Sequence, residues 1–314
     1  MIHIDILLSE EQIAQDFLDS LKKHDLSEKF FYWFPLSVRA WINLCRDGEY
    51  RNYIRSHSIL EEHASNLVSM IHSRPVEIIS LGAGQGTKDF LILEELQKQD
   101  KFLNYRPVDA SQGLLEIACR VAKEKNFSCC GLKADLNNDY HLQNIRNISN
   151  KNSRLFMILG NTLGAFDPLV FAKKLDNMMQ NGDFLILDGE IFNQTETIAG
   201  YDNPINRKFA FGPLSSVGLS EPDDGVLKID TDIDSRMHGL YRIRKQFQLS
   251  RDLKIMLSGE TLKLSSNTNI EMSWSYKYER NTLIDIVTSS GLQLIGEYAS
   301  KDKHFLTLLL KKVD

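Results

Sequence analysis

The sequence of 314 residues has few cysteines, no long apolar run and no strong excess of one charge. No window approaches the roughly 18 consecutive apolar residues of a membrane-spanning helix, and the first residues, MIHIDILLSEEQ, lack the basic flank of a signal peptide. Lys and Arg total 37 against 42 Asp and Glu, so the net charge of −5 gives no field that attracts a polyanion. We therefore expect a cytoplasmic protein that binds neither nucleic acid nor membrane.

Patterns for disulfides and metals are also missing. The four cysteines form no C-x-x-C pair, and the adjacent Cys129 and Cys130 are more typical of strand thiols than of a disulfide framework. The eight histidines form no H-E-x-x-H motif, and His57 and His63, six positions apart, face different sides of a helix. The sequence thus predicts structural thiols and no metal site.

The N-terminal part is helical in pattern. Apolar residues make up 42% and charged residues 25%, as in ordinary globular proteins, and the length suggests two structural units. Residues 9–72 carry apolar side chains at helical spacing, interrupted by the aromatic segment KFFYWFPLSVRAWI, in which Pro35 breaks any continuous helix. This segment is either core packing or an aromatic wall for a small ligand.

From residue 76 onward, short apolar runs alternate with amphipathic stretches. Such alternation predicts a parallel sheet covered on both faces, a doubly wound α/β fold whose ligands bind at the carboxyl ends of the strands. The five strand-like runs are VEIISLG (76–82), LNYRPVDA (103–110), FSCCGLKADL (127–136), RLFMILGN (154–161) and DFLILDGEIF (183–192).

The alternation stops at about residue 193. Three runs with period-two character, GLYRIRKQFQL, LKIMLSGETLKL and NIEMSWSYKY, predict an antiparallel meander without helices inserted over residues 193–280. A helix ending at Gly291 and two strands, LQLIGEYAS and KHFLTLLLKK, then complete the sheet. The connection between these strands is too short for a parallel crossover, so the final pair should be antiparallel.

The most informative segment is LGAGQGTKDF. Gly82, Gly84 and Gly86 follow a strand and precede a helix, so the turn can approach a ligand closely and present backbone amides to it. The spacing is G-x-G-x-G, whereas a dinucleotide-binding turn has its third glycine one position later to seat the helix against a pyrophosphate. The turn therefore favours a nucleoside ligand without pyrophosphate.

Two acids end the next two strands. Asp109 in RPVDAS can accept hydrogen bonds from a ribose diol, and Asp135 in KADL can accept one from an adenine amine. Either acid alone could instead cap the following helix. The glycine turn, both acids and an antiparallel final strand pair are together typical of a class I methyltransferase, a Rossmann-like fold that uses S-adenosyl-L-methionine.

Further motifs run along nearly the whole chain. They are KFFYWF, EYRNYIRSHSIL, LGAGQGTKDFLIL, YRPVDAS, ADL, ILGNTLGAF and, more weakly, GYDNP and SWSYKY. In these motifs the chain resembles the histidine-specific methyltransferase family, which includes the enzyme that trimethylates histidine in ergothioneine biosynthesis and fungal enzymes that methylate dimethylallyltryptophan.

The resemblance implies a two-part organisation. Residues 61–192 and 281–314 would form the cofactor-binding domain, while residues 1–60 and 193–280 would form a substrate or lid domain over the acceptor. The acceptor would be a small-molecule amine, most simply that of an amino acid or its derivative. The implied cofactor contacts are Gly82, Gly84, Gly86, Lys88, Asp109, Asp135 and Leu136.

On the substrate side the chain departs from the family pattern. Ala165 stands where the family has an asparagine that holds the substrate. Ser273 and Ser275 stand at the positions of a carboxylate and a hydroxyl that contact the imidazole, and Glu271 could replace the acid only by a register shift. Arg51 replaces a tyrosine, which leaves its neighbour Tyr50 as the candidate for substrate binding.

Methyl transfer needs no covalent nucleophile, because the sulfonium methyl is itself electrophilic. The protein has to align the acceptor lone pair and exclude water. We expect Asn161 and Thr162, after the fourth strand, to line the methyl-transfer face, unless they only form a turn and a helix cap. Tyr201, from the resemblance, and Asp188 could hold the hydrogens of the amine.

Two other functions fit parts of the sequence. A nicotinamide-dependent oxidoreductase would need the later glycine and an acid about 20 residues downstream, whereas Asp109 follows Gly82 by 27 positions. A protein that kept the cofactor pocket but lost catalysis would explain the altered substrate motifs.

Overall fold

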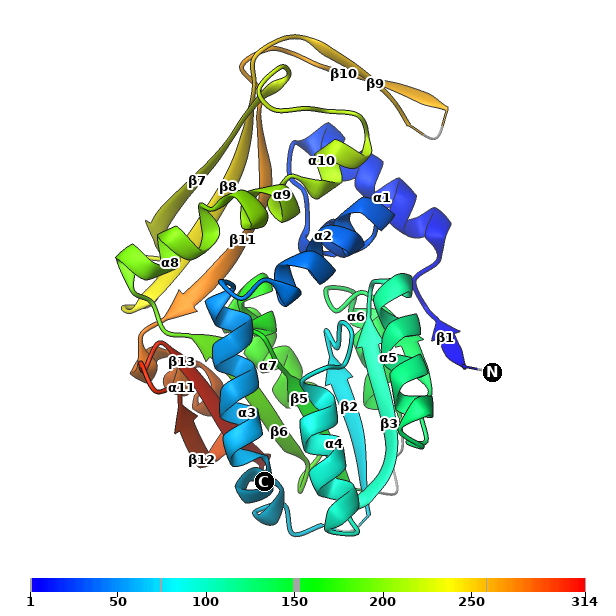
Figure 1. Cartoon of the computed structure of the whole chain (residues 1–314), viewed down its shortest axis with the longest axis vertical. Coiled ribbons are helices and arrows are strands. Elements are labelled where there is room, and N and C mark those ends of the chain that lie inside the picture. Colours follow the sequence, from blue (N-terminus) through cyan, green and yellow to red (C-terminus); the bar gives the residue numbers. More distant parts are fainter. Residues whose placement is uncertain (1, 74, 149–152, 258, 314) are drawn as a thin grey trace.

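The computed structural model describes residues 2–73, 75–148, 153–257 and 259–313. Its centre is an eight-stranded sheet with the strand order β1-β4-β3-β2-β5-β6-β13-β12 (Figure 1). Strands β1 to β6 pair in parallel, whereas β13 runs antiparallel to both β6 and β12, which confirms the predicted final pair. The strands are β1 (Ile4–Ile6), β2 (Val76–Leu81), β3 (Phe102–Asp109), β4 (Gly131–Lys133), β5 (Ser153–Ile158), β6 (Phe184–Glu190), β12 (Leu292–Ala299) and β13 (Phe305–Lys312).

Helices cover both faces of this sheet, as expected for a doubly wound fold. Buried side chains of α3, α4 and α5 pack on one face, and those of α6, α7 and α11 pack on the other. The helices are α3 (Arg51–Ser69), α4 (Asp89–Lys98), α5 (Gln112–Glu124), α6 (Asp139–Arg146), α7 (Pro168–Met178) and α11 (Arg280–Thr288).

The remaining elements lie beyond the carboxyl ends of the parallel strands, in the upper part of Figure 1. A three-stranded antiparallel sheet of order β11-β8-β7 and a β9–β10 hairpin pack with short helices around one buried cluster, which includes Phe17, Phe31, Phe209 and Phe247. These elements are α1 (Glu10–Lys23), η1 (Glu28–Tyr32), α2 (Pro35–Arg46), α8 (Gln194–Tyr201), α9 (Pro204–Ala210), α10 (Gly212–Ser216), β7 (Gly225–Ile233), β8 (Leu240–Leu249), β9 (Leu253–Leu257), β10 (Glu260–Leu264) and β11 (Asn269–Tyr278).

The prediction of a helix-free insertion is wrong for its first part, where α8, α9 and α10 occupy residues 194–216. These helices have eight, seven and five residues, too few to show an apolar period. Their starts are instead fixed locally, because the side chains of Asn193 and Asn203 accept hydrogen bonds from the first turns of α8 and α9. The edge strands β1 and β7 also escaped prediction.

The aromatic segment of the N-terminal part serves both purposes considered above. Phe30 and Phe31 are fully buried in the core, whereas Tyr32 and Trp41 line a cavity. Pro35 is the first residue of α2, a position where its missing amide hydrogen costs nothing.

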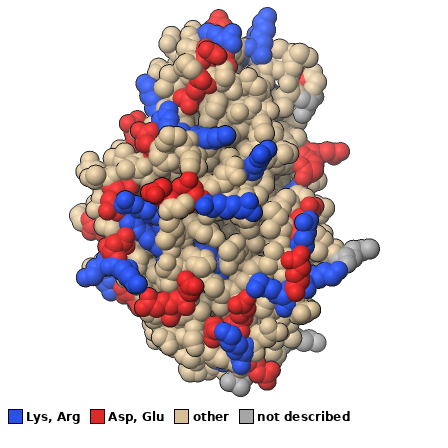
Figure 2. All heavy atoms as spheres, in the orientation of Figure 1, with Lys and Arg blue, Asp and Glu red and all other residues tan. Residues whose placement is uncertain are grey.

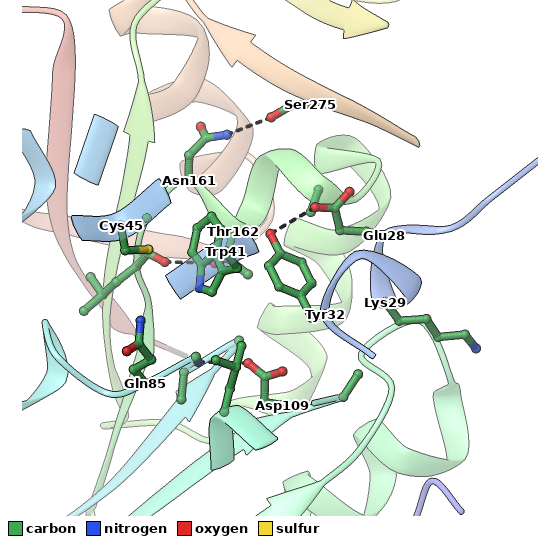
Figure 3. Close-up of a pocket in the computed structure, with 18 of the residues that line it drawn as sticks. Glu28, Lys29, Tyr32, Trp41, Cys45, Gln85, Asp109, Asn161, Thr162 and Ser275 are labelled. Atoms are coloured by element: carbon green, nitrogen blue, oxygen red, sulfur yellow. Dashed lines mark hydrogen bonds between the residues drawn. The ribbon is translucent and has the colours of Figure 1, made fainter. Parts of the chain in front are cut away.

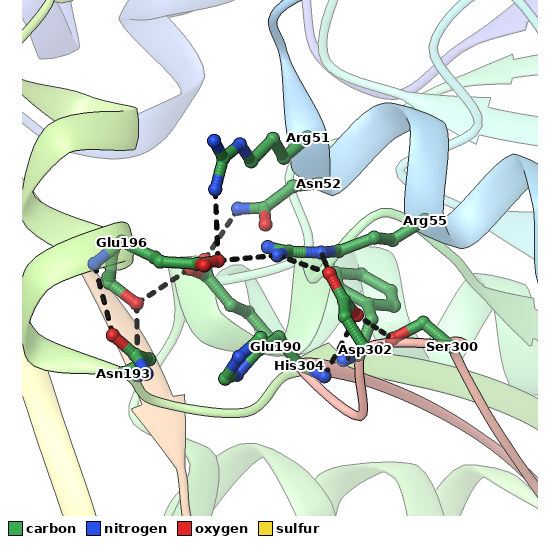
Figure 4. Close-up of polar contacts among 11 residues, drawn as sticks. Arg51, Asn52, Arg55, Glu190, Asn193, Glu196, Ser300, Asp302 and His304 are labelled. Atoms are coloured by element: carbon green, nitrogen blue, oxygen red, sulfur yellow. Dashed lines mark hydrogen bonds and ion pairs between the residues drawn. The ribbon is translucent and has the colours of Figure 1, made fainter.

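A chain of ion pairs joins the inserted segment to the central sheet (Figure 4). Arg55 of α3 pairs with Glu196 of α8 at 2.7 Å and with Asp302, in the connection between β12 and β13, at 2.5 Å. Arg51 pairs with the same Glu196 at 3.1 Å. These contacts hold α8 against the start of α3 and the end of the sheet.

The face of the molecule in Figure 2 carries acidic and basic side chains interspersed, without an extended area of one sign. Within the described residues, none of the helices combines the length and the apolar character that a bilayer crossing requires.

Candidate functional site

A cavity lies between the carboxyl ends of the parallel strands and the elements above them (Figure 3). It brings together most of the residues singled out in the sequence, although they come from distant parts of the chain. The ones that line it are Tyr50, Gly82, Gly84, Lys88, Asp109, Asp135, Leu136, Asn161, Thr162, Ala165, Tyr201 and Ser275. Gly86 and Ser273 are not among the lining residues.

The three glycines of the turn after β2 share one backbone requirement but differ in what surrounds them. All three residues have positive φ: +70° at Gly82, +56° at Gly84 and +73° at Gly86. A Cβ at Gly82 would lie 2.7 Å from Cγ2 of Thr162, and one at Gly86 would lie 3.1 Å from the Tyr105 hydroxyl. At Gly84 a Cβ would enter open space, with its nearest neighbour 3.9 Å away. The missing side chain therefore allows close packing at Gly82 and Gly86, whereas at Gly84 it leaves room for a ligand.

Asp109 is held by the glycine turn. Its Oδ2 accepts a 2.9 Å hydrogen bond from the Gly84 amide, and its Oδ1 accepts one of 2.9 Å from the Ser111 amide. Helix α5 is capped by Ser111, so Asp109 is not the N-cap residue. Burial raises the pKa of the Asp109 carboxyl. The carboxylate lines the cavity, where it can accept hydrogen bonds from a ribose diol.

Asp135 has a partner that the sequence did not reveal. Lys29 donates to its Oδ2 at 2.7 Å, while the Asn137 amide donates to its Oδ1 at 2.8 Å. Lys29 also lines the cavity and pairs with Asp16. Asn138 caps α6, so capping does not explain the acid at position 135.

Lys88 reaches across the turn to the end of β5. A Cβ at Gly160, where φ is +83°, would overlap Nζ of Lys88, so glycine is required for this approach. Burial raises the pKa of Asp188, and the positive charge of Lys88 opposes that rise. Asp188 accepts from Ser56 and the Asn161 amide and does not line the cavity.

Asn161 is a cross-link rather than a free hydrogen-bonding group. Its Nδ2 donates to Ser275 Oγ at 3.3 Å and to the Tyr276 carbonyl at 3.2 Å, and its Oδ1 accepts from the Glu190 amide at 3.0 Å. It thereby ties the end of β5 to β6 and β11. Thr162 donates to the Leu159 carbonyl at 2.8 Å, so the turn considered from the sequence is formed, although both residues line the cavity.

A buried polar network surrounds Ser275. Its Oγ lies 3.1 Å from the Tyr201 hydroxyl and 3.0 Å from Lys277 Nζ. Lys277 pairs at 2.8 Å with Glu190, which also accepts from Asn52. The side chains of this ion pair are 0% and 3% exposed. Lys277 belongs to the SWSYKY motif, but no local pattern reveals its pairing with Glu190, because the two residues lie on strands and are 87 positions apart.

The carboxylate expected near Ser273 comes from another part of the chain. Ser273 donates at 2.6 Å to Oε2 of Glu28, which lines the cavity. Tyr32 donates at 3.2 Å to Oε1 of the same carboxylate (Figure 3). Glu271 instead pairs with Arg244 at 2.7 Å. Glu271 is not among the lining residues, so the carboxylate that lies beside Ser273 at the cavity is that of Glu28.

Tyr50 lines the cavity directly before α3, and burial raises the pKa of its phenol far above the usual range. Its neighbour Arg51 is engaged by Glu196 and is not a lining residue.

Outside the cavity, the described residues include one cluster with metal-ligand chemistry. Ligand atoms of His3, Asp5 and Cys130 lie within 4.8 Å of one another at the edge strand β1. Asp5 already pairs with Arg106 at 3.2 Å, so we assign the cluster no role. The cysteines are free thiols.

A glycine turn with open space at Gly84, acids after β3 and β4, and an antiparallel final strand define a class I S-adenosylmethionine-dependent methyltransferase. The family model described as histidine-specific methyltransferase, SAM-dependent, matches residues 13–312. The chain belongs to this family. Membership excludes the nicotinamide-dependent alternative raised by the glycine turn.

Curated relatives are distant but extend over most of the chain. An N-methyltransferase, fsqC, of Aspergillus fumigatus is 26% identical over 87% of this chain and 76% of its own length. Ergothioneine biosynthesis protein 1 of Schizosaccharomyces pombe is 23% identical over 98% of this chain but only 41% of its own length. Histidine N-alpha-methyltransferase of Mycobacterium tuberculosis is 23% identical over 72% of this chain and 69% of its own.

Proposed function

We propose that this methyltransferase acts on the amine of an amino acid or an amino-acid derivative. We call the part of the cavity that is lined by Glu28, Tyr201, Ser275 and Lys245 the acceptor half. Its mixed polarity is the observation that carries the proposal. Such groups recognise a small zwitterion better than a flat apolar ring. The names of the relatives, an N-methyltransferase and a histidine N-alpha-methyltransferase, support an amine acceptor.

In this proposal the sheet side holds the cofactor. The Gly84 backbone approaches the nucleoside, Asp109 accepts from the ribose hydroxyls, and Asp135, with Leu136 beside it, accepts from the adenine amine. When bound, S-adenosylmethionine supplies an electrophilic methyl group. The protein contributes orientation and exclusion of water, which can lower a barrier by about 7 kcal/mol or more.

The acceptor side carries Tyr50, Thr162 and Tyr201. Their oxygen atoms can accept hydrogen bonds from the N–H groups of the amine. This leaves the lone pair of the nitrogen directed at the methyl group. Asn161 acts as a positioning residue, because its side chain fixes Ser275 and the end of β6. Ser273 acts through Glu28 in the same way.

We also propose that residues 61–192 and 281–314 form the cofactor domain and that residues 1–60 and 193–280 form the domain over the acceptor. The limit at residue 60 falls inside α3, so Arg51, where that helix begins, is the better boundary. A cytoplasmic location without nucleic-acid or membrane partners completes the proposal.

The test is a screen of amino acids and amino-acid derivatives with the purified protein and S-adenosylmethionine. The expected result is formation of S-adenosylhomocysteine together with an N-methylated product of at least one amine. The Asp109→Ala variant serves as the control for enzyme-dependent turnover. Methylation confined to hydroxyl or carbon acceptors would refute the amine proposal, and cofactor binding without turnover of any amine would favour a protein that has lost catalysis.

A further inference from the structure

Lys245 is a buried lysine without an ionic partner. It lies on β8, is 4% exposed and lines the acceptor half of the cavity. Within the described part of the chain its Nζ makes no ion pair within 4.0 Å and no hydrogen bond. The Phe31 ring lies beneath Nζ, with 4.8 Å between Nζ and the ring centroid. The other buried lysines are engaged: Lys277 by Glu190, Lys133 by Glu10, and Lys101 by the Val68 carbonyl.

The alternation of side chains along β8 explains why this ammonium points inward, because Ile243, Lys245 and Phe247 are all buried on the same face. β8 and β11 pair regularly except for a shift between Glu271 and Trp274, and Lys245 lies opposite that bulge. Ser273, inside the bulge, has a φ of +62° and donates to Glu28. The bulge thus places Ser273 where it holds Glu28, whose carboxylate lines the same cavity as Lys245 without forming an ion pair with it.

An unpaired ammonium in such a place is costly. Removing a charge from water is unfavourable unless a partner compensates for the lost hydration, and a single aromatic face compensates only in part. Burial lowers the pKa of Lys245, while the charge of Glu28 favours the ammonium form. The Glu28 carboxylate is nevertheless held by Ser273 and Tyr32, and it forms no ion pair with Lys245 within 4.0 Å. An anionic partner for the Lys245 ammonium therefore has to come from a molecule that binds in the cavity.

We propose that Lys245 binds a carboxylate of the methyl acceptor, so that the substrate is an amine that also carries an acid. This inference rests on the proposed function and narrows its substrate class. Lys245 offers three donors to the anion, and Glu28 beside it accepts from donor groups on the same molecule. The carboxylate could belong to the backbone of an amino acid or to its side chain, and the following experiment separates the two.

The experiment measures binding of matched ligands to the complex of the protein with S-adenosylhomocysteine, by calorimetry. The first set compares L-histidine with histamine, L-tryptophan with tryptamine and L-tyrosine with tyramine, which differ only in the α-carboxylate. The second compares L-glutamate with L-glutamine. In the wild type we expect at least one acid to bind about tenfold or more tightly than its neutral counterpart. A preference in the first set indicates an α-carboxylate, and one in the second indicates a side-chain carboxylate.

The variants Lys245→Met and Lys245→Arg identify the group responsible. The methionine variant should lose the preference, and the arginine variant, which keeps the charge, should retain much of it. Lys228→Met, on the neighbouring strand β7 with its side chain exposed, changes net charge equally and should have no effect. Titration with S-adenosylhomocysteine alone confirms that each variant folds.

The inference is overturned if the wild type shows no preference in either set, or if Lys245→Met keeps it. The proposed function fails separately, when acids bind through Lys245 but no N-methylated product forms with S-adenosylmethionine.

Discussion

The Gly84 amide donates a 2.9 Å hydrogen bond to Oδ2 of Asp109, 25 residues further along the chain. This bond joins the turn after β2 to the end of β3 and fixes the carboxylate at the cavity wall. A carboxylate held by two backbone amides is pre-positioned for a ligand that donates hydrogens, because it needs no rearrangement on binding.

Asp109→Ala should weaken binding of S-adenosylhomocysteine by about 10- to 100-fold, because it removes charge-assisted hydrogen bonds to the ligand. The substitution also leaves the Gly84 and Ser111 amides without an acceptor, so some stability should be lost. Asp109→Asn keeps the shape of the side chain and one acceptor oxygen. Its affinity for S-adenosylhomocysteine should therefore fall between those of the wild type and the alanine variant. Calorimetric titration and thermal unfolding of the same samples separate the effects, and unchanged affinity in the alanine variant would refute the assignment.

Gly82→Ala should destabilise the protein through two additive effects. An alanine at positive φ costs about 1–2 kcal/mol, and contact with Cγ2 of Thr162 adds about 1–3 kcal/mol. Gly182→Ala is the matched control, since Gly182 has a φ of +90° but nothing within 4 Å of a Cβ. Denaturant unfolding should show the larger loss at position 82, with partial recovery when Thr162→Ser is added. Equal losses at both positions would contradict the steric account.

Lys277→Met should cost about 3–5 kcal/mol of unfolding free energy, because it leaves the Glu190 charge buried without its partner. Lys98→Met removes a lysine from an ion pair whose lysine side chain is 67% exposed, and it should leave stability nearly unchanged because water screens the pair. Urea unfolding of both variants tests the contrast. A loss at position 277 as small as that at position 98 would show that the buried pair contributes little.

Asp89 should make the protein more stable at low pH, which is opposite to the usual effect of a carboxylate that forms an ion pair. Burial raises its pKa from 3.8 to about 6, opposed by hydrogen bonds from Tyr105 and Ser80. The folded protein then binds the proton more tightly than the unfolded chain, so this contribution is fully present below about pH 4 and is lost as pH rises through about 6. The loss amounts to at most about 3 kcal/mol.

Unfolding of the wild type and Asp89→Asn at several pH values tests this, without cofactor. The wild type should lose stability relative to the variant between pH 4 and 6, because the amide does not titrate. Parallel pH profiles would show that Asp89 has an ordinary pKa in the folded protein.

The sheet could be predicted from the sequence, and so could the meeting of the glycine turn and two acids at one cavity, because both depend on local patterns. The glycine turn and the acids at positions 109 and 135 each follow an apolar strand, and parallel strands bring their carboxyl ends to one edge. The acceptor side could not be predicted in this way. Glu28 meets Ser273 across 245 positions, at a bulge in β11 that no residue pattern marks.

The most direct test of the account is a crystal structure of the protein with S-adenosylhomocysteine. The ribose hydroxyls should lie within hydrogen-bond distance of Asp109, the adenine amine near Asp135, and the Gly84 backbone against the nucleoside. A nucleoside bound away from the turn and both acids would contradict the account.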